Sequence, residues 1–149
     1  SLGEHGWWNK VTVFDIGARV PLVMWVPESK GMGAETEAVV ELLDLYPTLI
    51  DFCTLEAPHK LQGESLRPIV DDPSTRGQNA AYTQVTRGQV GMGYSVRQGA
   101  WRLTQWGADG SGGLELYQVT EDREGYYNHA DDPEHAVIRD RLHGLLKQG

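Results

Sequence analysis

The chain has 149 residues, which is long enough for one domain with a hydrophobic core. Charged residues make up 23% and hydrophobic residues 40% of it, which is ordinary globular usage and excludes a disordered tail. The formal net charge of -8 at pH 7 disfavours a surface for nucleic acid or an anionic membrane, so we expect neither partner. No apolar run approaches the roughly 20 residues that a membrane span needs.

The N-terminal stretch holds the densest set of functional side chains. Residues 2–10 read LGEHGWWNK, a His, an acid, two Trp and a Lys among glycines, followed by the strand-like run at 11–15. Gly3 and Gly6 permit backbone conformations closed to other residues, so we expect a loop, and binding groups commonly lie on loops. A surface loop whose Trp pair caps the core remains open as an alternative. A chain that opens directly on this stretch is expected to come from a longer protein.

The next elements are one short strand and one helix. The apolar run Val20–Val26 ends at Pro27, and its length and β-branched content favour a buried strand. A glycine-rich loop at 28–36 leads to a helix expected over Leu45–Cys53, with Asp44 as its cap and Pro47 in its first turn. Three apolar residues share one face of this helix: Leu45, Leu49 and Phe52.

Residues 56–77 form a long connection rich in proline, with a short helical turn expected at 65–70. The composition favours a linker, so the predicted boundary divides 1–77 from 78–149. Cys53, the single cysteine, excludes an internal disulfide and a multi-thiolate metal site. Its apolar neighbours indicate a small buried residue.

The second part predicts an antiparallel meander covered by a helix. Four short segments rich in aromatic and β-branched residues alternate with turn formers, and a hairpin is expected across Gly99. These segments are 81–85, 93–97, 101–106 and 114–119. A helix is expected to start at Asp131-Asp132-Pro133, with an apolar stripe that covers one face of the sheet. The stripe consists of Ile138, Leu142, Leu145 and Leu146.

Several other residues are of types that could carry chemistry. The remaining histidines are scattered: His59, His129, His135 and His143. The spacing of His135 and His143 does not place them on one helix face, so the sequence predicts no metal site. Arg97 and Arg102 lie on expected strands, where an exposed face is favoured over a place at a pocket rim.

Four ordered blocks of the sequence resemble the type I sulfatases of the alkaline-phosphatase-like superfamily, above all their iduronate-2-sulfatase branch. In that family a loop L-G-[ED]-H-G-x-W-x-K precedes an R-V-P-L strand. The matching blocks are LGEHGWWNK with FDIGARVPLVMWVP, VELLDLYPTLIDFCTLEAP with LQGESLRPIVDDP, MGYSVRQGAWRLTQW, and LELYQVTEDREGYYNHADDPEHA. The resemblance covers nearly the whole chain in family order.

The resemblance implies a fold and a site. Residues 1–77 would be the tail of an alkaline-phosphatase-like α/β domain, and 78–149 a small four-stranded antiparallel sheet packed by a C-terminal helix. Lys10 holds the position of the family lysine that binds a sulfate oxygen, and a compact ammonium suits that role. Trp8 matches the tryptophan of the same motif and His5 its histidine, so both are candidates for shaping the pocket; a loop-stabilising His5 and a solvated Lys10 remain alternatives.

The departures from the family limit what the chain does alone. A sulfatase nucleophile is a formylglycine made within C/S-x-P-S/A-R, whereas Cys53 is followed by Thr-Leu-Glu. The acidic metal ligands of the family, which hold a divalent ion such as Ca²⁺, have no match here. We therefore expect formylglycine and metal in the N-terminal remainder, and an inactive isolated chain. The sequence does not give the compartment; sulfatases of this type are often exported, and the parent would be extracytoplasmic if its remainder carries an export signal. A phosphomonoester or phosphonate hydrolase and a non-catalytic binding module remain alternatives.

Overall fold

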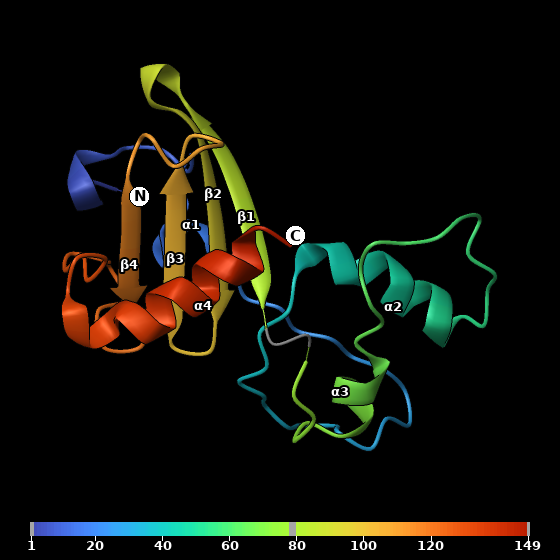
Figure 1. The fold of residues 1–149 in the computed structure, drawn as a ribbon. Helices are drawn as coiled ribbons and strands as arrows, with labels where there is room; N and C mark the ends of the chain where they lie inside the picture. Colours follow the sequence, from blue (N-terminus) through green and yellow to red (C-terminus); the bar gives the residue numbers. More distant parts are fainter. Residues whose placement is uncertain (1, 78–79, 149) are drawn as a thin grey trace. The chain divides into compact units, whose positions relative to one another are not determined.

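The computed structural model describes residues 2–77 and 80–148 (Figure 1). Contacts between Cα atoms divide the chain into two compact units, one of Ser1–Pro21 with Tyr82–Gly149 and one of Leu22–Ala81. The N-terminal segment therefore packs with the sheet that lies far from it in sequence. We call Ser1–Pro21 with Tyr82–Gly149 the sheet unit and Leu22–Ala81 the helical unit. Whether the parent protein divides into domains at residue 77 stays a prediction.

Four strands in the order β1-β2-β3-β4 form the meander that the sequence predicts, which is antiparallel along both pairings of β3. They are β1 (Ala81–Arg87), β2 (Gly91–Gln98), β3 (Trp101–Trp106) and β4 (Leu114–Gln118), with a 3₁₀ turn η3 (Gly88–Val90) between the first two. Gln98 pairs with Trp101 across a two-residue turn, and Gly99 takes the positive φ of 56° that such a turn requires. The hairpin across Gly99 is confirmed.

One face of the sheet is covered by the C-terminal helix. The 3₁₀ turn η4 (Pro133–His135) leads into α4 (Ala136–Leu146), which packs on β2 and β3. Figure 1 shows α4 lying across these strands. The fully buried residues of this layer come from three strands and the helix: Val96, Leu103, Leu116 and Leu142. Their burial supplies the hydrophobic stabilisation of the sheet unit, as the stripe in the sequence predicts.

The N-terminal segment covers the opposite face. It contains the 3₁₀ turn η1 (Glu4–Gly6) and the single-turn helix α1 (Asp15–Ala18). Phe14 packs against Tyr117 of β4 with the ring centroids 5.4 Å apart, and both belong to a buried cluster with Val119. The strand-like run at 11–15 is thus not a strand; it is an extended entry to α1 whose apolar side chains rest on the sheet.

Among its described residues, the helical unit contains three short helices: η2 (Leu42–Asp44), α2 (Leu45–Phe52) and α3 (Arg67–Asp71). Helix α2 and the turn at α3 match the expectations, with Pro47 in the first turn of α2. Asp44 makes no side-chain cap to α2. Its carboxylate instead accepts hydrogen bonds from the backbone N–H of Glu41 at 2.9 Å and of Glu64 at 3.0 Å. Asp44 therefore joins η2 to the segment before α3.

Two expectations for this part of the chain are wrong. Residues 20–26 form no strand, and none of their side chains is buried. Cys53 is exposed because α2 ends at Phe52 and leaves it in the cap. Within residues 2–77 and 80–148, no helix is long and apolar enough to cross a membrane.

The helical unit exposes many large apolar side chains. Val23 is 91% and Trp25 79% exposed, and the face of α2 around Leu49 is also open. The buried position of α2 is Thr48, whose hydroxyl donates to the Asp44 carbonyl at 2.6 Å and accepts from the Leu66 N–H at 2.8 Å. The unit is therefore held as much by hydrogen bonds as by an apolar core.

Candidate functional site

Backbone hydrogen bonds fix the N-terminal loop. The N–H of Gly3 donates to the Trp7 carbonyl at 2.8 Å, and the N–H of Gly6 donates to the Gly3 carbonyl at 2.9 Å. Both glycines have positive φ, 129° and 71°, which most side chains resist. The carboxylate of Glu4 accepts from the Leu2 N–H at 2.6 Å, and backbone hydrogen bonds lower its pKa. The loop predicted from the sequence is thus a closed, defined turn.

His5 attaches this loop to the rest of the sheet unit. Its ring stacks on Phe14 with centroids 4.2 Å apart and planes 2° from parallel, and it lies 4.9 Å from the ring of Tyr126. Its Nε2 is hydrogen-bonded to the backbone carbonyl of Glu124. These contacts hold the imidazole on three sides, so the geometry favours the loop-stabilising role for His5.

Lys10 stands on a fixed backbone with an exposed side chain. The side-chain oxygen of Asn9 accepts the N–H of Val11 at 2.9 Å, and the N–H of Thr12 donates to the Lys10 carbonyl at 3.0 Å. The ammonium of Lys10 forms no ion pair within the part of the chain that the structure describes. A positioned, unpaired cation can bind an anion without first breaking an internal contact.

A buried ion pair anchors the segment that carries Lys10. Asp15, 6% exposed, accepts two hydrogen bonds from Arg102 on β3, from Nη2 at 2.8 Å and from Nε at 3.1 Å. Nη1 of Arg97 lies 3.5 Å from the other carboxylate oxygen, and Arg102 also donates to Ser95 at 3.1 Å. Burial lowers the pKa of Arg102 while the charge of Asp15 raises it. The expectation that Arg97 and Arg102 occupy an exposed face is wrong, because their partner lies more than 80 residues earlier.

A groove of about 620 Å³ lies between residues 7–11 and the β1–β2 connection. Its lining residues come from these two segments: Trp7, Asn9, Val11, Thr86, Arg87, Gly88 and Gln89. Trp8 is not among them; its side chain is 77% exposed and its ring lies over Gly3. The groove combines an aromatic wall with one cation, which suits a sugar ring that carries an anionic group.

The cation of this groove is held by aromatic rings. The guanidinium of Arg87 lies 3.9 Å from the ring centroid of Trp7 and 5.5 Å from that of Trp106. The Nε1–H of Trp106 donates to Glu115 at 3.0 Å, and burial raises the pKa of that carboxyl against the effects of Trp106 and Arg87. Trp7 and Arg87 were not singled out from the sequence as a pair, because they meet only through the fold.

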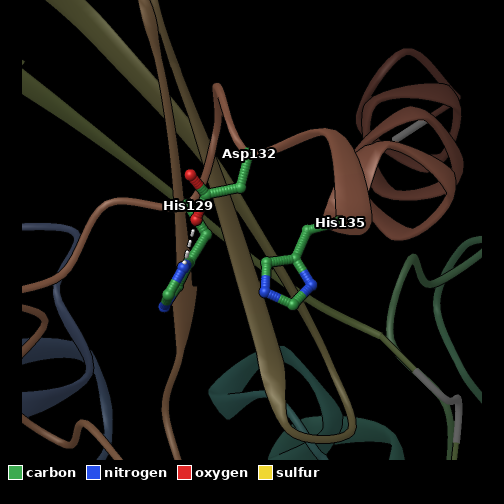
Figure 2. A group of neighbouring side chains, drawn as sticks. All are labelled: His129, Asp132 and His135. Carbon is green, nitrogen blue, oxygen red and sulfur yellow. Dashed lines mark hydrogen bonds and ion pairs between the residues drawn. The ribbon is translucent and has the colours of Figure 1, made fainter.

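The structure also brings two of the scattered histidines together. His129 and His135 lie with ring centroids 4.9 Å apart, and Asp132 accompanies them (Figure 2). Helical spacing does not link this pair in the sequence, because a turn, not one helix, connects them. His143 does not join them; its Nε2 is hydrogen-bonded to Gln105 on β3 at 2.8 Å.

Comparisons with known proteins relate this geometry to one family. The sequence model described as N-sulphoglucosamine sulphohydrolase, C-terminal, matches residues 3–149. Iduronate 2-sulfatase of Mus musculus is 27% identical over 207 aligned residues, and the match covers 98% of this chain and 38% of the relative. N-acetylglucosamine-6-O-sulfatase of Bacteroides thetaiotaomicron is 35% identical over 71 residues, with 48% of this chain and 13% of the relative covered.

A solved structure extends the likeness to three dimensions. A protein in complex with its substrate D-glucosamine-2-N,6-O-disulfate superposes with a TM-score of 0.86 at 26% identity, over 99% of this chain and 31% of that one. The chain thus spans well under half the length of each of these relatives. The four-stranded sheet with its C-terminal helix is the arrangement expected at this end of the alkaline-phosphatase-like fold.

Proposed function

The chain belongs to the sulfatases that carry the N-sulphoglucosamine sulphohydrolase C-terminal domain, and we propose that it is the C-terminal part of an enzyme that hydrolyses a sulfate ester on a sugar. A uronate-containing sugar is the substrate class we favour, because the groove offers Arg87 as a partner for a carboxylate beside an aromatic wall. The match to iduronate 2-sulfatase supports this choice. The D-glucosamine-2-N,6-O-disulfate complex of the structural relative supports a sulfated sugar in general.

The observation that carries the proposal is Lys10, an exposed cation on a fixed loop of a sulfatase domain. Its backbone is set by the Asn9 turn, and Asp15 ties the segment to the sheet. In the parent enzyme the Lys10 ammonium contacts a sulfate oxygen and stabilises the charge that develops as the ester oxygen departs. Trp8, which lies outside the groove and is exposed, forms a further part of the pocket in the parent enzyme, and His5 positions the loop.

The residues around Lys10 do not form a metal site. Glu4 is hydrogen-bonded within its own loop, and Asp15 is paired with two arginines, so neither carboxylate is available to a Ca²⁺ ion. Cys53 lacks the sequence context of a formylglycine precursor. In a sulfatase, formylglycine and the divalent ion supply the nucleophile and a second positive charge; we assign both to the N-terminal remainder of the parent. We also propose an extracytoplasmic location for the parent.

The exposed apolar surface of the helical unit supports the proposal that another part of the parent protein packs on it. Val23, Trp25 and Leu49 of the helical unit are each more than half exposed. Large apolar surface left in water is typical of a face that another polypeptide covers. The N-terminal remainder of the catalytic domain would cover them and add the absent strand partner for residues 20–26. The isolated chain is accordingly inactive in this proposal.

A comparison of the isolated chain with the full-length protein tests the proposal. We expect the full-length protein to release sulfate from an aryl sulfate and from a 2-O-sulfated uronate disaccharide, and the 149-residue chain to release none. Activity of the full-length protein on phosphomonoesters or phosphonates alone would favour the hydrolase alternative of the same superfamily. Intact-mass analysis of each sample shows which polypeptides are present. Sulfate release by the pure 149-residue chain would contradict the assignment of the nucleophile and metal to the N-terminal remainder.

A further inference from the structure

A second cluster of chemically competent side chains lies in the turn between β4 and α4. His129, Asp132 and His135 each offer one ligand atom, and these atoms all lie within 4.8 Å of one another (Figure 2). Nδ1 of His129 is 2.7 Å from Oδ2 of Asp132. The two imidazole rings stand at 82° to each other, so they do not stack. This was the one such group of three found within residues 2–77 and 80–148.

We propose that His129, Asp132 and His135 form a binding site for a divalent transition-metal ion, with Zn²⁺ the preferred ion. Imidazole nitrogen suits Zn²⁺ and its first-row neighbours, and one carboxylate completes a common mixed set of ligands. Ca²⁺ and Mg²⁺ require mainly oxygen ligands, and this group of three side chains supplies one carboxylate, so they bind less well. The fourth position of a tetrahedral Zn²⁺ is left to water.

The turn holds the three side chains before any ion arrives. The N–H of His129 donates to the Leu116 carbonyl at 2.8 Å, the N–H of Asp132 to the His129 carbonyl at 3.1 Å, and the N–H of His135 to the Asp132 carbonyl at 3.0 Å. The ring of Trp101 lies against both histidines; its centroid is 4.8 Å from the ring centroid of His135 and 5.8 Å from that of His129. A backbone fixed at each ligand reduces the entropy that metal binding must overcome.

The three side chains need only a small rotation to bind Zn²⁺, and they are accessible to the ion. Ligand atoms about 2.0–2.1 Å from a tetrahedral Zn²⁺ lie roughly 3.3 Å apart. The three ligand atoms now lie within 4.8 Å of one another, so side-chain rotation must bring them to that spacing. The His129 and His135 side chains are 28% and 26% exposed, which admits the ion and its water. Zn²⁺ would displace the proton shared by Nδ1 of His129 and the Asp132 carboxylate. It would tie the start of α4 to residue 129, whose N–H donates to Leu116 of β4. If Zn²⁺ binds the folded chain and not the unfolded chain, it also raises the free energy of unfolding.

Zn²⁺ titration of the 149-residue chain tests the site. The chain is treated with a chelator, exchanged into buffer at pH 7.5, and titrated with Zn²⁺ in competition with a chromophoric chelator. We expect one equivalent to bind. His129→Ala and His135→Ala should each weaken binding by at least about tenfold, since loss even of a supporting group costs 10- to 100-fold. The matched control is His59→Ala, an exposed histidine of the helical unit, which should bind as the unchanged chain does.

Co²⁺ supplies an independent readout, because its visible absorption bands are intense only in a low-coordinate site of the kind proposed. Circular dichroism confirms that each variant is folded; a variant that is not folded is replaced by His135→Gln or Asp132→Asn and judged by the same tenfold criterion. The proposal is overturned if the chain binds no Zn²⁺ up to about 100 μM, or if both histidine variants bind as tightly as the His59→Ala control.

Discussion

Replacing Asp15 by alanine should strongly destabilise the sheet unit. The change removes two hydrogen bonds to Arg102, at 2.8 and 3.1 Å, and the 3.5 Å ion pair with Arg97. Arg102 is 3% exposed, so its charge would stay buried with Ser95 as its remaining hydrogen-bond partner. Removing one partner of a buried ion pair typically costs about 3–5 kcal/mol, which is a large part of the total stability of a small protein.

Urea unfolding followed by tryptophan fluorescence measures this effect, because four of the five tryptophans lie in the sheet unit. The matched control is Asp140→Ala. The Asp140 side chain is 68% exposed, and its Oδ1 lies 2.9 Å from Nε of Arg139. An exposed pair of that kind contributes about 0–1 kcal/mol. A loss below about 1 kcal/mol for Asp15→Ala, or equal losses for the two variants, would refute the reasoning. Because Asp15 anchors the segment that holds Lys10, activity of the parent enzyme should fall as well.

Two further predictions concern packing and pH. Gly93→Val should lower the free energy of unfolding by about 1–3 kcal/mol in thermal or urea unfolding, because a Cβ there would lie 2.6 Å from the ring of Trp106. In Gly144→Ala the added Cβ meets no atom within 4 Å, so this variant should be stabilised by about 0.5–1 kcal/mol. A Gly144→Ala protein less stable than the Gly93→Val protein would contradict the close contact at Gly93. Burial, followed by the charge of Lys147, lowers the pKa of His143 below 6.5 in the folded state. The unfolded chain therefore binds more protons, so stability should be present above pH 6.5 and be lost as the pH falls below it. His143→Gln should flatten this loss in melting temperatures between pH 7.5 and 5.5, whereas parallel pH curves would refute it.

The sheet and its covering helix could be predicted because their signals are local. Alternating residues around Val96 and Leu103 mark strands whose two faces differ, and the turn at Gly99 fixes their register. The apolar stripe ending at Leu146 marks α4 at helical spacing. In each case the pattern lies within a few residues, so neighbouring positions suffice to read it.

The positions that could not be predicted depend on distant partners. Arg102 reads as an ordinary exposed strand residue until Asp15 meets it across the sheet unit. The groove pairs Trp7 with Arg87 in the same way, and no spacing in the sequence links them. Residues 20–26 have the composition of a buried strand but form no strand among the described residues. Composition alone cannot supply the neighbouring strand that such a segment needs. His129 and His135 meet through a turn, which helical periodicity does not describe.

The role of Lys10 is most directly tested by steady-state kinetics of the full-length protein with Lys10→Ala. Loss of one charge that stabilises the transition state should lower kcat/KM for an aryl sulfate by about 100- to 1,000-fold. Lys60→Ala, which removes an exposed lysine of the helical unit, serves as the control and should leave kcat/KM unchanged. A Lys10→Ala enzyme within threefold of the control would contradict the assignment of Lys10 to the sulfate.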